Sequence, residues 1–383
     1  MLKLLTIVGA RPQIIKAAAI SRAIRTHFSD QLEEVIIHTG QHYDEGMSRI
    51  FFEEMGIPPE NYNLGVGSKS HGAQTGDMLK GIEEIILKEN PAALVIYGDT
   101  NSTLAGALAA AKLLLPVIHI EAGLRSFNKA MPEEINRICA DHISTLLFSP
   151  TASGFKNLLR EGFKADNVEP FTPDNPKIYH CGDLMYDNSL YFSTVADEKT
   201  DIIKRLGLEG KPFLLATIHR NTNTDDPIRL SSLFDAINQL SVDNNIPVVM
   251  PLHPRTKKML ETHLLPEVRT EVELNSKFLI IEPAGFLEMI ALEKAAQMVL
   301  TDSGGVQKEA YFFKKPCIIL RSETEWVEIV ENGAAIVTDA DNEKIVAAYY
   351  ELIKREIAYQ PVFGDGAAAE FICGEIIKHI KNK

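Results

Sequence analysis

Cysteine and long apolar runs are scarce in this sequence. The 383 residues include four cysteines, which form neither a C-x-x-C pair nor a zinc-ligand spacing, so we expect small reduced thiols. No apolar run approaches the roughly 18 residues of a membrane-crossing helix. The N-terminal residues enter a strand-like run at once and lack the features of a signal peptide. These absences predict a cytoplasmic protein.

Positive charge is in deficit as well. The chain has 39 lysines and arginines against 52 aspartates and glutamates, which gives a formal net charge of −13. A field of that sign repels nucleic acid and anionic membranes, so we exclude both as partners. The basic residues must therefore act locally, inside a pocket. No histidine and carboxylate spacing resembles a metal site, and we predict no metal.

Short apolar runs rich in β-branched residues alternate with segments of helical period along the chain. Continuous apolar strands separated by helices indicate parallel sheets covered on both faces, which places the chain in the α/β class. Proline, glycine and polar residues cluster at 163–177, and the strand–helix rhythm then repeats. We therefore predict two doubly wound domains, residues 1–175 and 176–363, followed by an amphipathic helix within 364–383.

Polar and glycine residues follow the predicted strands. The strand ends of the first domain read GAR, TGQ, GDT and EAG, and those of the second include HR, HPR and DSGG. In open parallel sheets, ligands bind outside the carboxyl ends of the strands. Both sheets therefore present a polar edge, which suits a ligand held in a cleft between the two domains.

The segment 302–309, which reads DSGGVQKE, combines a strand end, a tight turn and a helix start. Gly304 and Gly305 let backbone N–H groups approach an anion, and the helix N-terminus adds favourable partial charge. Glu309 lies about one turn into the helix, where a carboxylate can accept hydrogen bonds from two ribose hydroxyls. The alternative is an ordinary N-cap at Ser303 with glycines for turn geometry. The segment is neither a P-loop nor a dinucleotide fingerprint.

Basic residues near the strand ends are candidates for contact with phosphate. Arg11 and Lys16 lie about one and a half helical turns apart, within reach of a diphosphate, although a solvated helix start is the alternative. His219 ends the first strand of the second domain and could protonate a departing phosphate, unless it is a structural histidine. His253 is a weaker candidate of the same kind.

Three carboxylates are candidates for proton transfer. Asp99 and Glu121 directly follow apolar strands, and Glu133 follows Pro132 in the first turn of a predicted helix. Carboxylates that converge on one carbon can serve as general base and general acid. For Glu133 the alternative is simple complementation of the helix dipole.

Together these motifs resemble the non-hydrolysing UDP-N-acetylglucosamine 2-epimerases. The matching pieces, in the family's order, read GARPQIIK, HTGQH, YGDTNSTLAGALAA, HIEAGLR, MPEEINR, IHR, LHP, TDSGGVQKEA and GDG. The resemblance implies a GT-B-type architecture, with two Rossmann-like domains and a final helix that crosses back to the first. It also implies a homodimer that works in polysaccharide synthesis without nicotinamide or another cofactor.

The implied reaction is reversible inversion at C2 of the sugar. UDP is eliminated with loss of the C2 proton, which gives a bound 2-acetamidoglucal, and both are then added back with the proton on the other face. By resemblance, the acid/base carboxylates are Asp99, Glu121 and Glu133, and further active-site residues are Lys16 and His219. The positions that match UDP-binding residues are Arg11, His253, Ser303, Gly304, Gly305 and Glu309.

The chain departs from the family's pattern in three places. Asn221 to Asn223 replace the usual Arg-Glu-Asn after His219-Arg220, and residues 324–328 read TEWVE instead of TERPE. The loop at 71–76 also differs, which puts an allosteric substrate site in doubt. The TEWVE and HGAQTGDML segments look more like the subgroup acting on UDP-2,3-diacetamido-2,3-dideoxyglucuronate, which we favour over UDP-GlcNAc as substrate.

Three other functions compete with this interpretation. A GT-B glycosyltransferase would share the fold and the UDP site, but the three carboxylates argue against it. The hydrolysing branch of epimerases is usually fused to a kinase domain, for which this chain is too short. A non-catalytic UDP-sugar sensor would not need the carboxylates together with His219.

Overall fold

The computed structural model describes residues 1–40, 57–252 and 254–381. The chain divides into two compact units, which we describe separately. The first comprises Met1–Asn188 and Pro361–Lys383, and the second comprises Ser189–Gln360. Among the described helices, none combines the length and the apolar content that a membrane crossing requires.

The first unit contains a seven-stranded sheet in the order β3-β2-β1-β4-β5-β6-β7, with parallel pairing throughout. Its strands are β1 (Leu2–Val8), β2 (Leu32–His38), β3 (Tyr62–Asn63), β4 (Ala93–Tyr97), β5 (Val117–Ile120), β6 (Leu146–Ser149) and β7 (Lys177–His180). Its helices are α1 (Arg11–His27), α3 (His71–Glu89), α4 (Asn101–Lys112), α5 (Pro132–His142), α6 (Ala152–Arg160) and α17 (Ala368–His379). The central strand β4 is buried along its whole length, as its run of apolar residues predicts.

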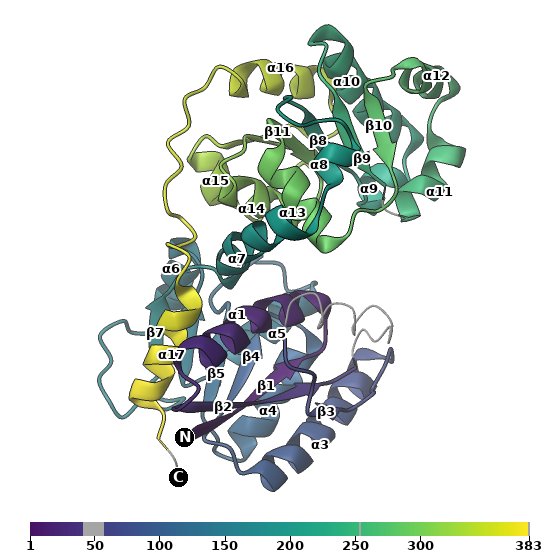
Figure 1. Cartoon of the computed structure of the whole chain (residues 1–383). Coiled ribbons are helices and arrows are strands. Elements are labelled where there is room, and N and C mark those ends of the chain that lie inside the picture. The colour runs from purple at the N-terminus through teal and green to yellow at the C-terminus, as the bar shows by residue number, and fades with distance from the viewer. Residues whose placement is uncertain (41–56, 253, 382–383) are drawn as a thin grey trace. The chain divides into compact units, whose positions relative to one another are not determined.

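The end of the first unit differs from the predicted boundary at residue 175. Strand β7 pairs with β6, and α7 (Leu184–Lys199) begins in this unit before the chain enters the second. The final helix α17 packs against α1 (Figure 1). The backbone N–H of Ala369 in α17 donates to Oδ2 of Asp187 in α7 at 2.8 Å, so a hydrogen bond joins these two helices. The chain therefore leaves and re-enters the first unit at Asn188 and Pro361.

The second unit contains a six-stranded parallel sheet in the order β10-β9-β8-β11-β12-β13. Its strands are β8 (Leu214–Thr217), β9 (Val248–Pro251), β10 (Phe278–Ile281), β11 (Met298–Thr301), β12 (Cys317–Ile319) and β13 (Ala335–Val337). Its helices are α8 (Ile202–Arg205), α9 (Asn221–Thr224), α10 (Pro227–Asp243), α11 (Pro254–His263), α12 (Pro266–Leu274), α13 (Phe286–Ala295), α14 (Gly304–Phe312), α15 (Val327–Glu331) and α16 (Asn342–Leu352).

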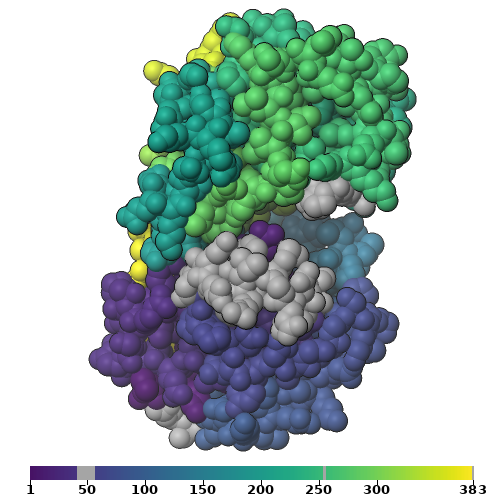
Figure 2. All heavy atoms as spheres, turned by 45° about the vertical axis from the view of Figure 1, so that its right-hand side comes forward, coloured from purple at the N-terminus to yellow at the C-terminus, as the bar shows by residue number. Residues whose placement is uncertain are grey.

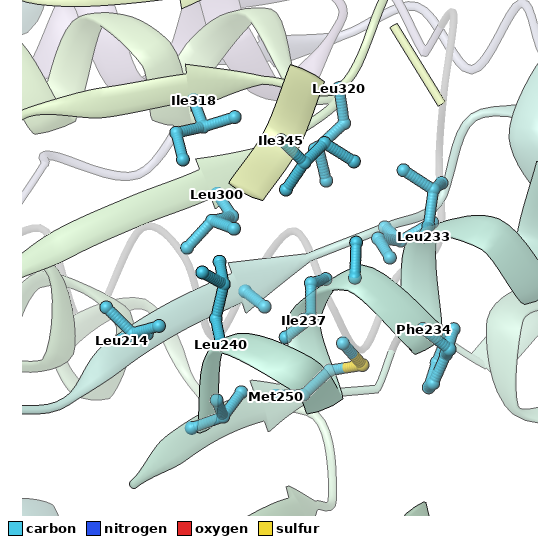
Figure 3. Packing of buried hydrophobic residues seen from close by; sticks show 14 of the residues in the cluster. Leu214, Leu233, Phe234, Ile237, Leu240, Met250, Leu300, Ile318, Leu320 and Ile345 are labelled. Atoms are coloured by element: carbon cyan, nitrogen blue, oxygen red, sulfur yellow. The ribbon is translucent and has the colours of Figure 1, made fainter. Parts of the chain in front are cut away.

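The core of the second unit lies between this sheet and the helices α10 and α16. Leu214, Leu300 and Ile318 project from the strands toward Ile237 of α10 and Ile345 of α16 (Figure 3). Each of these side chains is fully buried, which stabilises the unit by about 1.5–3 kcal/mol per residue. The two parallel sheets confirm the predicted α/β class.

One predicted loop is a helix. Residues 71–76 form the first turns of α3, which belongs to the face of the first unit that Figure 2 turns toward the viewer. Gly72 and Gly76 lie in helical backbone, where the sequence reads as a break. The side-chain Oε1 of Gln74 accepts a hydrogen bond from Asn101 Nδ2 at 2.7 Å, so a buried tertiary contact holds the turn that propensity alone disfavours.

Candidate functional site

The carboxyl ends of β1, β4 and β5 bring three of the predicted residues together. Lys16 on α1 is buried, and its Nζ pairs with Glu121 Oε2 at the end of β5. Asp99 follows Gly98 at the end of β4. A side chain at Gly98 would lie 3.0 Å from Glu121 Oε2 and 3.7 Å from Lys16 Nζ, so the glycine leaves the space that this ion pair occupies. Lys16, Asp99 and Glu121 thus form one charged cluster.

The carboxyl group of Asp99 holds its proton more strongly than usual. Burial raises the pKa of Asp99, the positive charge of Arg137 opposes that rise, and the negative charge of Glu121 adds to it. Arg137 on α5 pairs with Asp99 Oδ2 directly. The sequence analysis missed Arg137, although it lies one helical turn after Glu133 in the same motif, where the two can share a helix face.

Lys16 remains an ammonium in this cluster. Burial lowers the pKa of Lys16, but the charge and hydrogen bond of Glu121, with the charges of Asp183 and Asp99, outweigh it and leave the pKa raised. The ammonium in turn favours the ionised form of Glu121. The cluster therefore combines a carboxylate paired with an ammonium and a carboxyl group whose pKa is raised, a difference in environment that general acid–base chemistry needs.

Glu133 and Arg11 are both exposed, unlike Lys16. Glu133 is exposed in the first turn of α5, and none of the described contacts joins it to Asp99 or Glu121. Its neighbour Glu134 is buried and accepts hydrogen bonds from the backbone N–H groups of residues 126 and 127 at 2.9 and 3.0 Å. Arg11 is exposed at the start of α1.

In the second unit, Asp302 connects the ends of β8 and β11. This fully buried carboxylate accepts hydrogen bonds from the backbone N–H groups of His219 and Arg220, each at 3.0 Å, and from Asn223 Nδ2 at 3.1 Å. His219 Nδ1 lies 3.3 Å from Asp302 Oδ1, and 36% of its side chain is exposed. Asp302 therefore fixes the turn that carries His219, a role that the sequence analysis did not assign.

Ser303 caps the N-terminus of α14. Its Oγ accepts a hydrogen bond from the backbone N–H of Val306 at 3.4 Å, so the N-cap alternative describes the local structure. A side chain at Gly305 would have no neighbour nearer than Ser303 Oγ at 3.8 Å and Glu309 Oε2 at 4.0 Å. The Gly305 turn thus lies open beside the hydroxyl and the carboxylate, which leaves room for a ligand to approach the backbone.

The divergent TEWVE segment contacts this turn. Trp326 Nε1 donates to the carbonyl oxygen of Gly304 at 2.9 Å, and Lys308 Nζ lies 4.2 Å from the centre of the indole ring. Thr324 Oγ1 donates to Gln307 Oε1 at 2.6 Å. In this chain, the TEWVE segment therefore holds the start of α14 through the hydrogen bonds of Trp326 and Thr324. The sequence alone did not show these tertiary contacts.

A second carboxyl group lies behind Glu309. Glu293 on α13 is 1% exposed and shares a side-chain hydrogen bond with Glu309. Burial first, and then the charge of Glu309, raise the pKa of Glu293 well above its ordinary value. Glu293 is therefore the protonated partner and donates to the carboxylate of Glu309.

A pocket of about 680 Å³ adjoins the ends of β8 and β12. Its lining is rich in guanidinium groups and consists of Arg220, Asn221, Thr222, Arg229, Arg321, Ser322 and Glu323. Arg321 pairs with Glu325 at 2.8 Å, and Arg229 pairs with Asp339. Two of the three guanidinium groups that line the pocket are thus already paired with carboxylates.

Two predicted features lie outside the described residues: His253 and the Gln41-His42 end of the HTGQH motif. Among the residues that the structure describes, no group of three or more histidine, cysteine or acidic side chains is placed to hold a metal ion.

Two parallel doubly wound sheets, with polar turns at their carboxyl ends, define an α/β protein of the GT-B type. The family model for UDP-N-acetylglucosamine 2-epimerase matches residues 25–377. A UDP-N-acetylglucosamine 2-epimerase homolog of Methanococcus maripaludis is 47% identical over 380 residues, which cover 99% of this chain and 100% of that protein. The UDP-2,3-diacetamido-2,3-dideoxy-D-glucuronate 2-epimerase of Pseudomonas aeruginosa is 46% identical over 378 residues, covering 98% of this chain and 100% of that protein.

Solved structures agree. The structure of UDP-GlcNAc 2-epimerase from Methanocaldococcus jannaschii has a TM-score of 0.85 and 40% identity, and covers 98% of this chain and 100% of that one. The chain therefore belongs to the UDP-N-acetylglucosamine 2-epimerase family and is an isomerase acting on a UDP-sugar. The predicted family and the GT-B fold are confirmed.

Proposed function

We propose that this isomerase epimerises UDP-2,3-diacetamido-2,3-dideoxy-D-glucuronate at C2. The observation that carries the chemistry is the charged cluster of the buried Lys16 and the half-buried Asp99 and Glu121. The substrate rests on the 46% identity to the Pseudomonas enzyme of that name and on the TEWVE segment. The proposal includes the homodimer and the cytoplasmic location that the sequence analysis expects.

UDP-GlcNAc is the second candidate substrate. A UDP-N-acetylglucosamine 2-epimerase of Methanocaldococcus jannaschii is 42% identical over 375 residues, which cover 97% of this chain and 98% of that protein. The two candidates share the nucleotide and the acetamido group at C2, so they require the same reaction. They differ at C3 and C6 of the sugar.

The reaction needs the C1–O bond to break because the C2 proton alone is not acidic. Departure of UDP develops positive charge at C1, which acidifies the C2 proton. The C2–H and C1–O bonds break, a C1=C2 double bond forms, and the glycal and UDP stay bound. Return of UDP to C1 and of a proton to the other face of C2 completes the inversion.

The first unit supplies the proton transfers. Glu121, kept ionised by Lys16, accepts the C2 proton, and Asp99, whose pKa is raised, delivers a proton to the opposite face. The roles exchange in the reverse direction, as reversibility requires. Glu133 is the third carboxylate of this proposal, although it is exposed in this structure.

The second unit binds the nucleotide. The backbone N–H groups at the start of α14 and the Ser303 hydroxyl hold the diphosphate, and Glu309 accepts hydrogen bonds from the ribose. His219, oriented by Asp302, protonates or neutralises the departing phosphate. Arg220 of this unit adds positive charge for the diphosphate, and Arg11 stays a predicted diphosphate-binding residue.

A direct competition tests the substrate. We would measure kcat/KM for the diacetamido-uronate and for UDP-GlcNAc under the same conditions, with separation of the C2 epimers. The proposal predicts the larger value for the uronate. A larger value for UDP-GlcNAc would keep the reaction and replace the substrate.

A further inference from the structure

His119 and Asp141 form a buried pair beneath the charged cluster. Both side chains are fully buried, His119 in β5 and Asp141 near the end of α5. His119 Nδ1 lies 2.7 Å from Asp141 Oδ1, and His119 Nε2 lies 2.8 Å from the carbonyl oxygen of Gly98. Asp141 Oδ2 accepts a hydrogen bond from the backbone N–H of Gly123 at 3.1 Å. One pair of side chains thus contacts two separate turns.

Those two turns carry the cluster's carboxylates. Gly98 directly precedes Asp99, and Gly123 is two residues after Glu121. Glu121 itself has a φ of 72°, a left-handed conformation that residues other than glycine rarely adopt. A side chain at Gly123 would lie 2.4 Å from the backbone oxygen of Gly154, so the turn has no room to relax on that side. Strained backbone of this kind persists only where surrounding contacts determine it.

The hydrogen bonds assign the protons of His119. A carbonyl oxygen only accepts, so Nε2 carries a hydrogen toward Gly98. Asp141 faces His119 on one side and Arg125, at 2.7 Å, on the other. Burial raises the pKa of Asp141, but His119 and Arg125 outweigh it and leave the pKa lowered. Nδ1 of His119 therefore faces a carboxyl group whose pKa is lowered, and Nε2 donates to Gly98.

Arg125 is shared by a second carboxylate. It pairs with Glu161 at 2.7 Å, and Glu161 in turn lies 3.3 Å from His142 Nε2. The buried Asp141 thus pairs with the guanidinium of Arg125, which compensates the cost of placing a carboxylate in the interior.

We propose that His119, which bridges Gly98 and Asp141, is a positioning residue that holds Asp99 and Glu121 at the separation that proton transfer requires. The inference rests on the proposed function of those two carboxylates. His119 and Asp141 touch no substrate in this account and act only through the backbone of the two turns. A purely architectural role, in which the pair merely fastens α5 to the sheet, is the competing explanation.

Kinetics on the full-length protein separate the two roles. His119→Gln and Asp141→Asn each remove part of the bridge, and a displacement of about 1 Å at a reacting group costs on the order of 100-fold in rate. We expect a loss of that order in kcat, with KM and the affinity for UDP nearly unchanged. Asp187→Asn is the matched control because Asp187 is a buried carboxylate of the same unit whose described hydrogen bond goes to Ala369. Normal kcat in folded His119 and Asp141 variants, or an equal loss in the control, would overturn the proposal.

Nitrogen-15 NMR of histidine-labelled wild-type protein tests the contacts of His119 with Gly98 and Asp141 directly. This measurement does not depend on the activity of any variant. The ring signals of His119, assigned by their absence from His119→Gln or by through-bond transfer, should show a hydrogen on Nε2 at neutral pH. An Nε2 without a hydrogen would contradict the bridge. Failure of the wild type to exchange the C2 proton would instead count against the proposed function, which this spectrum does not depend on.

Discussion

At the scale of single residues, the site works through charges that set one another's protonation. Lys16 pairs with Glu121, and the negative charge of Glu121 contributes to the raised pKa of Asp99. The sequence pointed to all three because each follows a predicted strand or begins the helix after one. It could not reveal Arg137 or Asp302 as partners, since those contacts join positions far apart in the chain, such as Asp302 and His219.

Arg137 sets the pH at which Asp99 titrates. The positive charge of Arg137 lowers the pKa of Asp99 against the effect of burial, so Arg137→Met should raise that pKa further. The limb of the kcat–pH profile that reports Asp99 should move to higher pH. An unchanged profile in a folded, active variant would mean that Asp99 is not the titrating group.

Glu309 should recognise the ribose, and Glu293 should orient it. Glu309→Gln removes a charged acceptor and should weaken UDP binding about 10-fold or more, with a smaller loss for 2′-deoxy-UDP, which has fewer hydroxyls to contact. Glu293→Gln keeps a donor toward Glu309, whereas Glu293→Leu removes it, so only the leucine variant should lower the preference for UDP over 2′-deoxy-UDP. Calorimetric titration measures these affinities. Equal preference in all variants would contradict the assignment.

At the scale of elements, apolar runs predicted nearly every strand, because buried parallel strands are continuous in sequence. The start of α3 escaped prediction, since Gly72 and Gly76 read as a break and the buried contact between Gln74 and Asn101 holds it. The boundary predicted at residue 175 assigns β7 to the second domain, whereas β7 pairs with β6 in the sheet of the first unit. The local sequence pattern predicts a strand but does not show which strand it pairs with.

The N-terminus of α14 depends on Trp326, the one tryptophan of the chain. Trp326→Phe keeps the ring but removes the hydrogen bond to Gly304, a contribution of about 0.5–1.5 kcal/mol, so UDP affinity should fall several-fold. In the wild type, UDP should also change the intrinsic fluorescence. A silent tryptophan together with normal affinity in the variant would place UDP elsewhere.

At the scale of the whole molecule, the chain crosses between the units twice, and α17 ends in the first unit. Ile372, Cys373 and Ile376 of α17 are fully buried there, and Asp187 accepts the backbone N–H of Ala369. The C-terminal helix is therefore part of the stability of the first unit. The amphipathic pattern predicted this helix, but only the structure shows that it packs against α1.

Asp187 makes that stability pH-dependent. Burial raises its pKa to about 6, above an unfolded value of about 3.9, so the folded state binds the proton more tightly. The free energy of unfolding should fall as pH rises from about 4 to about 6, by at most about 3 kcal/mol, and this fall should vanish in Asp187→Asn. Urea unfolding at a series of pH values measures it. A parallel pH dependence in both proteins would assign the effect to other groups.

The measurement that tests the central claim most directly is exchange of the C2 proton with solvent. Purified protein would be incubated in D₂O with the diacetamido-uronate or with UDP-GlcNAc, and proton NMR would follow the anomeric and H2 signals, with Asp99→Asn as control. The account predicts that one substrate loses its H2 signal and yields the C2 epimer with the wild type, and that Asp99→Asn abolishes both changes. Retention of H2 in both substrates, although UDP binds, would contradict it.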